Sequence, residues 1–232
     1  MAGLSGGSVL MWGGCIMAGR SLGSSLYLIV PCLLLAMGTS ARARSPTESR
    51  FSVPIEEASP TLAPFQHVRF CLRYPADCKS DPGETVQIEL TAETNELMNR
   101  VNHDVNAAIA PIHKSEVIEI NDGWTIAPTA GDCNDYAVTK RHELLQSGLP
   151  AKALRLAVVK TPSGIGHLVL VVATKKGDLV LDNLIEAIRP WQTTKYQWLK
   201  IQSASDARYW YQIKQPAMTL AHADQKFRMA DR

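Results

Sequence analysis

The sequence predicts an α+β fold, with helices first along the chain and an antiparallel sheet after them. Two segments between residues 91 and 149 repeat apolar residues at helical spacing. After residue 153 the period changes, and three apolar runs separated by short turn signals are typical of neighbouring strands. Because helices and strands are segregated along the chain, this order favours α+β over an alternating α/β sheet.

The composition is that of an ordinary globular protein. The chain has 232 residues, a formal net charge of +2 and 20% charged residues, which fits one domain with an additional arm. The sequence contains no long basic run and no acidic tail, so a nucleic acid is not expected as a partner.

Residues 1–43 are predicted to be a signal peptide. Leu26–Met37 is an apolar run of twelve residues, the length of a signal h-region and too short for the roughly 20 residues of a membrane span. Small residues follow it, so cleavage is expected after Ala41 or Ala43, and a start at Met17 would give a more ordinary signal. The alternative is a retained membrane anchor. We therefore expect a periplasmic or secreted protein with no stable membrane span after processing.

Residues 44–64 are rich in serine, proline, threonine and glutamate, and we expect them to form a linker or arm on the surface. The folded domain is then predicted to span residues 65–232. Within it, residues 91–109 are predicted to form an amphipathic helix that is capped by Thr91 or Thr94.

Cysteine usage agrees with export. Removal of the signal removes Cys15 and Cys32 and leaves Cys71, Cys78 and Cys133. Cys71 and Cys78 lie seven positions apart around a proline, and in an oxidising compartment we expect a disulfide there rather than two buried thiols. This pairing leaves Cys133 without a disulfide partner, which marks it as a candidate reactive thiol.

The second predicted helix begins within the stretch GDCNDYA, residues 131–137, and ends before Gly148. Asp132 is the expected N-cap, because its carboxylate can accept backbone N–H groups. Cys133 then lies at the helix N-terminus, where the helix dipole favours a thiolate and offsets the effect of the acidic neighbours.

Strands are predicted at residues 153–160, 166–174 and 178–184. The second strand is apolar on both faces, as expected of a central strand, and a hairpin joins it to the third. Further strands and covering loops are expected nearer the C-terminus, where the aromatic residues are Trp191, Tyr196, Trp198, Tyr209, Trp210 and Tyr211.

His167 is the candidate base for the Cys133 thiol. It is the one polar residue at the head of an apolar strand, whereas the other histidines after the signal lie in polar surroundings or before the disulfide loop. Asp182 ends the next strand, where a carboxylate needs a partner such as an imidazole. A nucleophile at a helix start, a base on a strand and an acid on the adjacent strand follow the logic of a catalytic triad. The alternatives are a core histidine and an ordinary strand-end aspartate.

The triad also constrains the hairpin. A two-residue turn at Lys176–Gly177 would pair Asp182 with Val171 and leave it on the order of 13 Å along the strand from His167, too far for a hydrogen bond. A four-residue loop at residues 173–176, or an equivalent bulge, would set Asp182 opposite His167. We therefore expect the wider loop.

Two groups are candidates to stabilise an oxyanion. The backbone N–H of Cys133 is the first, because a helix start offers N–H groups that lack intrahelical partners. Trp124, nine positions before Cys133, is expected to line the cleft and to donate its indole N–H. The alternative for Trp124 is an ordinary place in the core.

Three segments carry a likeness to a known family: GDCNDYAVTKRHELLQSGLP, GHLVLVVATKKGDLVLDNL and IRPWQTTKYQWLKIQSASDARYW. In order and spacing they resemble the bacterial transglutaminase-like cysteine proteinases, over residues 65–210. The three segments together are specific, although each alone is weak. The resemblance implies a papain/transglutaminase-like fold, export, and a triad that matches Cys133, His167 and Asp182.

The resemblance also implies a metal and partners. A periplasmic member of the family releases biofilm adhesins by cutting their N-terminal region, needs calcium, and is held by an inner-membrane receptor for cyclic-dimeric GMP. Its calcium site implies Asp132, Asn134 and Asp135 as ligands, with no cofactor needed for the chemistry itself. Where this chain has Asn134 the family commonly has an acidic residue. Calcium also accepts neutral oxygens, so the change predicts weaker binding.

The sequence therefore predicts an exported thiol peptidase that forms a thioester with an envelope or secreted protein. The first alternative is an acyl transferase of the same geometry, in which an amine resolves the acyl-enzyme. The second is a catalytically silent peptide-binding module, although such a module has no need to keep Cys133, His167 and Asp182.

Overall fold

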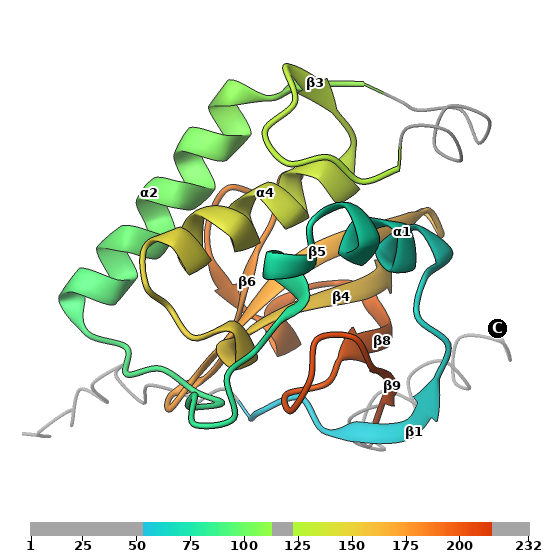
Figure 1. Cartoon of the computed structure of the whole chain (residues 1–232). Coiled ribbons are helices and arrows are strands. Elements are labelled where there is room, and N and C mark those ends of the chain that lie inside the picture. Colours follow the sequence, from blue (N-terminus) through green and yellow to red (C-terminus); the bar gives the residue numbers. More distant parts are fainter. Residues whose placement is uncertain (1–52, 113–122, 215–232) are drawn as a thin grey trace, which may run out of the picture. The chain divides into compact units, whose positions relative to one another are not determined.

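A computed structural model describes residues 53–112 and 123–214 of the chain (Figure 1). The predicted signal peptide lies outside these residues. Seven strands form one antiparallel sheet in the order β1-β9-β8-β4-β5-β6-β7. They are β1 (Glu57–Thr61), β4 (Leu154–Lys160), β5 (Gly166–Thr174), β6 (Gly177–Leu181), β7 (Arg189–Pro190), β8 (Gln197–Gln202) and β9 (Trp210–Ile213).

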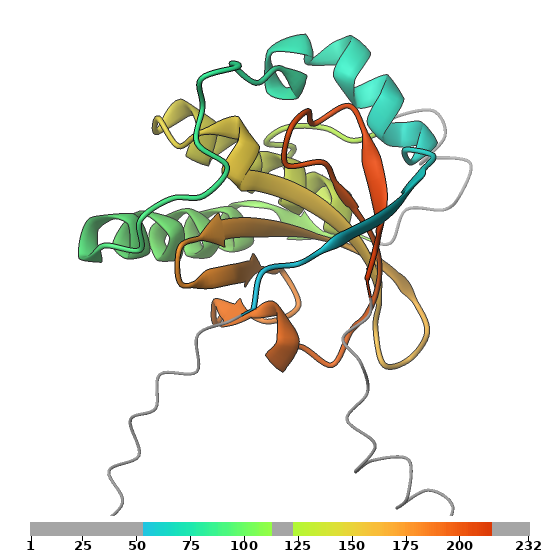
Figure 2. The ribbon, with the colours of Figure 1, turned by 90° about the horizontal axis from the view of Figure 1, so that it is seen from below.

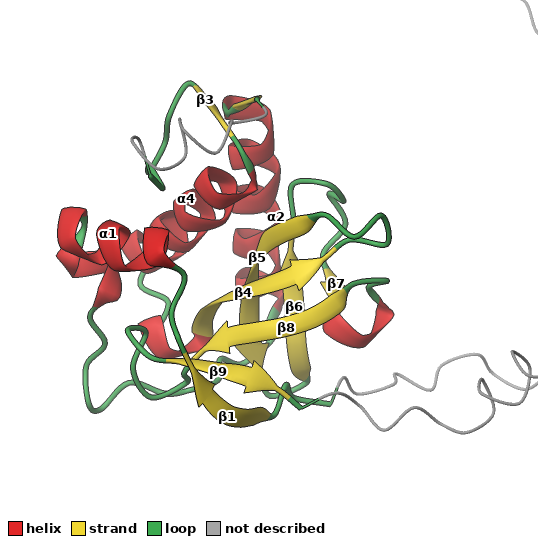
Figure 3. Cartoon of the chain, turned by 90° about the vertical axis from the view of Figure 1, so that its right-hand side faces the viewer, coloured by secondary structure: helices red, strands yellow, loops and turns green. Residues whose placement is uncertain are grey.

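The α-helices within the described residues gather on one side of this sheet, as Figure 3 shows. They are α1 (Phe65–Arg73), α2 (Ala92–Ala108) and α4 (Cys133–Gln146). The short strands β2 (Ala110–Pro111) and β3 (Ala130–Gly131) form a separate parallel pair. Short 3₁₀ turns are formed by Pro75–Cys78, Ala151–Ala153 and Trp191–Thr193. None of the helices within the described ranges is long and apolar enough to span a membrane. The predicted α+β class is confirmed.

Both candidate caps of the first predicted helix take part in its start. Thr91 is the N-cap of α2, and its hydroxyl accepts the backbone N–H of Thr94 at 3.2 Å. The Thr94 hydroxyl in turn accepts the Thr91 N–H at 2.9 Å. This reciprocal capping box satisfies two N–H groups that a helix start otherwise leaves without partners.

Strand β5 is buried on both faces, as its continuous apolar sequence predicts. Leu168 and Leu170 belong to the cluster under the helices, whereas Val169 and Val171 pack on the opposite face with Trp191. Full burial of one such side chain contributes about 1.5–3 kcal/mol. The strand that begins with His167 is therefore anchored by packing on both sides.

The predicted arm is wrong in part, because residues 57–61 form the edge strand β1. Figure 2 shows β1, in cyan, beside the red β9, with which it pairs in an antiparallel register. Just before it, Ile55 is buried and its N–H donates to the Asp178 carboxylate at 2.7 Å. Most side chains of β1 are exposed, so the strand is held by backbone pairing and leaves no apolar pattern in the sequence.

The predicted disulfide is confirmed. Cys71 of α1 and Cys78 of the following 3₁₀ turn are bonded, with their Cα atoms 5.5 Å apart. His67, one turn earlier in α1, brings its Nε2 to 3.4 Å from the Cys71 sulfur. The three side chains lie as close together as metal ligands, but disulfide sulfurs are not thiolates and do not bind a metal in this way.

His67 is a core residue rather than a surface histidine. It is 1% exposed, and the indole N–H of Trp210 donates to its Nδ1 at 3.2 Å. Burial, together with the charge of Arg141, lowers its pKa from 6.5 to about 4. The native structure therefore resists protonation of this ring, because the charged form is poorly solvated.

We expect His67 to make the protein less stable in acid. Between pH 6.5 and 4 the unfolded chain binds a proton at this residue and the native state does not, so stability falls as the pH falls through this window. The slope approaches about 1.4 kcal/mol per pH unit. Urea unfolding of wild type and His67→Asn at pH 7, 6, 5 and 4 measures the difference. Parallel curves for the two proteins would contradict it.

Candidate active site

The acidic residues on either side of Cys133 serve the start of α4. Asp132 is the N-cap, as predicted, and its Oδ1 accepts the Asn134 N–H at 2.9 Å. The Asp135 Oδ2 accepts the Asp132 N–H at 3.0 Å, which completes a capping box. Both carboxylates are thus engaged with the backbone, and each complements the positive end of the helix dipole.

Asp135 also ties the preceding loop to the helix. It is 0% exposed, and its Oδ1 accepts the Thr125 N–H at 2.9 Å. The carboxylate folds so closely over Gly131 that a Cβ atom there would lie 2.6 Å from Asp135 Oδ2. The glycine of the GDC stretch is therefore required for space, and the loop that carries Trp124 is fixed beside Cys133.

Cys133 opens onto a cleft of about 1010 Å³. The thiol residue is half-buried and takes part in no disulfide. Besides α4 and β5, the start of α1, parts of β2, β3, β4 and β8, and several loops line this cleft. It brings together five of the predicted site residues, which are Trp124, Asp132, Cys133, Asn134 and His167.

His167 and Asp182 form a buried pair at the head of β5. The His167 Nε2 lies 2.8 Å from the Asp182 Oδ1, and their side chains are 3% and 4% exposed. This is hydrogen-bond distance, and neither group is solvated. The predicted hydrogen bond between the two residues is therefore present.

The register that brings them together is not the predicted one. The strands pair Thr174 with Gly177 around a two-residue turn, so the expected four-residue loop is wrong. Leu181, the last residue of β6, pairs with Leu170, which sets the next residue, Asp182, two positions along from His167. Such diagonal neighbours on one face remain within reach of long side chains. Asp182 also follows the strand rather than ending it, which frees its side chain to lean toward the ring.

Tyr196 completes the surroundings of Asp182, and sequence analysis marked it only as one of the aromatic residues nearer the C-terminus. Its O–H donates to the Asp182 Oδ2, and the Leu184 N–H donates to the Oδ1 at 3.0 Å. Burial raises the pKa of Asp182, but the hydrogen bond and charge of His167, with the bonds from Tyr196 and Leu184, lower it more. The net pKa lies below its ordinary value, so the carboxylate is ionised.

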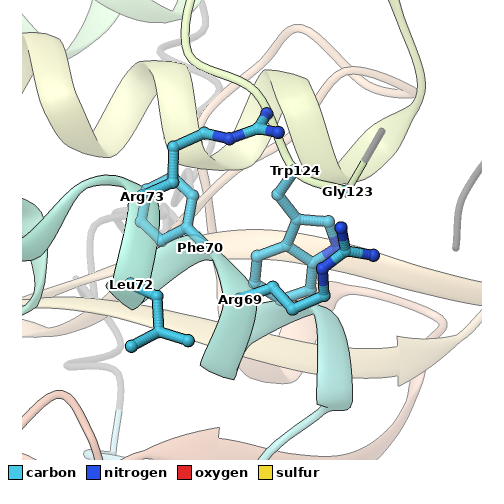
Figure 4. Close-up of a pocket in the computed structure, with 6 residues that line it drawn as sticks. All are labelled: Arg69, Phe70, Leu72, Arg73, Gly123 and Trp124. Carbon is cyan, nitrogen blue, oxygen red and sulfur yellow. The ribbon is translucent and has the colours of Figure 1, made fainter. Parts of the chain in front are cut away.

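Trp124 is buried between two cavities. It is 4% exposed, and its indole N–H has no hydrogen-bond partner within the described part of the chain. Besides the main cleft it lines a second cavity of about 270 Å³ with two arginines of α1. Figure 4 shows Trp124 with the other residues that line this second cavity, which are Arg69, Phe70, Leu72, Arg73 and Gly123. Both arginines already have interaction partners, so this cavity is not a ready-made anion site.

The three residues expected to bind calcium do not make a complete site among the described residues. Asp135 is fully buried, and both its oxygens accept backbone N–H groups. One oxygen of Asp132 caps α4. Calcium takes six to eight oxygen ligands. Among the described residues, no three carboxylates near Cys133 bring their oxygen atoms close enough together to share one ion.

A cysteine at a helix N-terminus that lines a cleft together with a histidine is an arrangement that thiol enzymes use. A family model described as bacterial transglutaminase-like cysteine proteinase matches residues 57–218. The chain belongs to this family of cysteine peptidases. Among curated proteins, none matches this chain.

Solved structures of LapG from Legionella pneumophila are similar to part of the chain. The first is 24% identical, with a TM-score of 0.38, and the likeness covers 48% of this chain and 64% of that one. An EGTA-treated form is 22% identical, covers 54% and 70%, and has a TM-score of 0.41. A calcium-bound form is 22% identical, covers 59% and 80%, and has a TM-score of 0.38. At these scores the likeness adds nothing to the family assignment.

We expect Tyr196→Phe to destabilise the protein at neutral pH by about 1.5–3 kcal/mol, the usual effect of losing a hydrogen bond to a charged group. The lowered pKa of Asp182 contributes stability that is present above its unfolded pKa and is lost as the pH falls through the folded pKa. The difference between variant and wild type should therefore shrink in acid. Urea unfolding at pH 7 and pH 3 measures it, with the exposed Tyr209→Phe as a control. A difference independent of pH would show that the lost bond does not depend on an ionised carboxylate.

Proposed function

We propose that this protein is an exported thiol peptidase in which Cys133 is the nucleophile, His167 the base and Asp182 the orienting acid. The observation that carries the proposal is the buried hydrogen bond between His167 and Asp182 at a cleft that also exposes Cys133. Membership of a cysteine peptidase family supports the same reaction class.

The hydrogen bond assigns the protons of His167. An ionised carboxylate only accepts hydrogen bonds, so the Asp182 side chain holds the proton of the ring on Nε2. The Nδ1 atom is then left to take the thiol proton of Cys133. The resulting thiolate is further favoured at the N-terminus of α4.

The thiolate then attacks the carbonyl carbon of the scissile peptide bond, and the electron pair moves onto the carbonyl oxygen. The Cys133 backbone N–H and the Trp124 indole N–H are the proposed donors to this oxyanion. The unpartnered, buried indole N–H supports the assignment of Trp124. When the C–N bond breaks, His167 returns its proton to the leaving amine, and water hydrolyses the thioester.

The substrate is proposed to be a polypeptide. Four exposed apolar side chains line the cleft from separate segments, which are Phe65, Ile112, Ile165 and Leu184. Exposed apolar surface around a polar centre is typical of a site that binds protein segments. Acyl transfer to an amine would use the same residues, and product analysis with and without an added amine separates it from hydrolysis.

Export remains part of the proposal. Residues 1–43 are the proposed signal peptide, with cleavage after Ala41 or Ala43. The Cys71–Cys78 disulfide supports an oxidising compartment. The inner-membrane receptor for cyclic-dimeric GMP stays a prediction from family resemblance, and co-purification from membranes with and without the nucleotide tests it.

We expect substitutions in the triad to have unequal effects. Cys133→Ala and His167→Ala should abolish turnover, because nucleophile and base act as a unit. Asp182→Asn should leave a small remainder, because Asp182 orients the ring without reacting. Before a substrate is known, the rate of iodoacetamide alkylation of Cys133 serves as the measurement.

In wild type this rate should stay high well below pH 8.5, the usual pKa of a thiol. It should fall at such pH in His167→Ala and in Asp182→Asn. His142→Ala is the matched control, because this histidine of α4 pairs with Asp77 and does not line the cleft. An ordinary thiol profile in wild type, or an unchanged one in His167→Ala, would refute the assignment. Mass spectrometry of proteins captured by Cys133→Ala would identify the substrate.

We expect calcium binding at Asp132 and Asn134 to be weak and to improve with an added carboxylate. Calcium should therefore raise the melting temperature of Asn134→Glu more than that of wild type, and EGTA should reverse the increase. Thermal unfolding of both proteins in calcium and in EGTA measures this. Equal melting temperatures under all conditions would exclude a calcium site at the start of α4.

A further inference from the structure

Two asparagines of α2 hold the loop that carries Asp182. The Asn106 side-chain N–H donates to the backbone carbonyl of Asp182 at 3.0 Å. One helical turn earlier, the Asn102 side-chain N–H donates to the carbonyl of Glu186 at 2.7 Å. Because residues four apart lie on one helix face, the two side-chain amides can both hydrogen-bond the segment 182–186, one at each end.

The gripped segment belongs to the candidate active site. Asp182 begins it, and Asn183 and Leu184 line the cleft. The Leu184 N–H also donates to the Asp182 carboxylate, so the backbone of the segment and the orientation of the carboxylate are coupled. A shift of the segment away from α2 would therefore move the hydrogen-bond acceptor of His167.

Stability alone does not explain why asparagines occupy these two positions of α2. Asn102 is 1% exposed, and the side-chain oxygens of Asn102 and Asn106 are buried without a partner among the described residues. A half-satisfied buried amide costs free energy, and apolar residues of similar shape would often be equally stable there. What each amide contributes in the described structure is its hydrogen bond to the segment.

We propose that Asn106 and Asn102 are positioning residues, which hold the carboxylate of Asp182 against His167 by clamping the segment 182–186 to α2. This rests on the proposed function, since it assumes that His167 and Asp182 govern the thiol of Cys133. Neither asparagine is among the residues that line the cleft, so in this role they act through Asp182.

Several ionisable side chains face the clamped segment. Lys140 of α4 is 1% exposed, and burial lowers its pKa to about 7 although the charges of Asp182 and Glu186 raise it. His167 of β5 contacts Asp182, and His103 of α2 contacts Glu186. All of these side chains are present in wild type and in the asparagine variants, so a comparison at the same pH isolates the effect of the asparagines.

The test measures the rate of iodoacetamide alkylation of Cys133 from pH 5.5 to 9.5 in full-length wild type, Asn106→Leu and Asn102→Ala. Below the ordinary thiol pKa this rate reports the thiolate fraction. We expect Asn106→Leu to be about fivefold slower near pH 6.5 and equal to wild type at pH 9.5, which is a rise of about 0.7 in the thiol pKa. Asn102→Ala should shift the profile in the same direction by less. Asn99→Ala is the control, because Asn99 is an exposed asparagine of the same helix.

Thermal unfolding of each variant separates positioning from stability. A clamp predicts a shifted profile even where Asn106→Leu melts at the wild-type temperature, whereas a purely structural role predicts no shift in a folded variant. Superimposable profiles for wild type, Asn106→Leu and Asn102→Ala would overturn the clamp and leave the proposed function intact. An ordinary thiol profile in wild type would overturn both. If Asn106→Leu does not fold, the result for Asn102→Ala decides.

Discussion

The candidate active site depends on one buried carboxylate. Asp182 is 4% exposed and ionised, and a charge in such a place is tolerated only when it is hydrogen-bonded on every side. His167, Tyr196 and the Leu184 backbone supply those bonds. These three residues come from different segments, which are β5, the loop after β6 and the residue just before β8. The position of the Asp182 carboxylate therefore requires that all three segments are in place.

A second buried carboxylate, that of Asp135, fixes the backbone around the proposed nucleophile Cys133. Asp135 accepts the N–H groups of Asp132 and Thr125, and it can do so only because Gly131 leaves room for it. This explains why a cysteine lies between acidic residues in this chain. The backbone N–H groups at the helix start hydrogen-bond the carboxylates and offset part of their negative charge. The same bonds that orient α4 therefore also reduce the repulsion of a thiolate at Cys133.

The two arrangements meet at the packing of α4 on the sheet. One face of β5 packs in the core under the helices, and its opposite face packs against Trp191 and the residues around it. His167 is the second residue of this buried central strand, and it lines the same cleft as Cys133. Polar contacts of α2 then reach the loop beyond β6 from the same side. Stability comes mainly from the apolar layers, and the geometry of the site comes from a few buried polar groups placed between them.

The sequence by itself determined the α+β class, the cap of α4, the disulfide and the central place of β5, because each follows from local spacing and residue type. It also singled out Cys133, His167 and Asp182 as candidates. Only the tertiary structure decided the hairpin register, in which Thr174 pairs with Gly177 and a diagonal contact replaces the expected direct one. Likewise, β1, Tyr196 and Asn106 have no signature in the sequence, since their roles depend on hydrogen bonds to residues far along the chain. Such long-range pairing is set by how the layers pack, and local patterns carry no record of it.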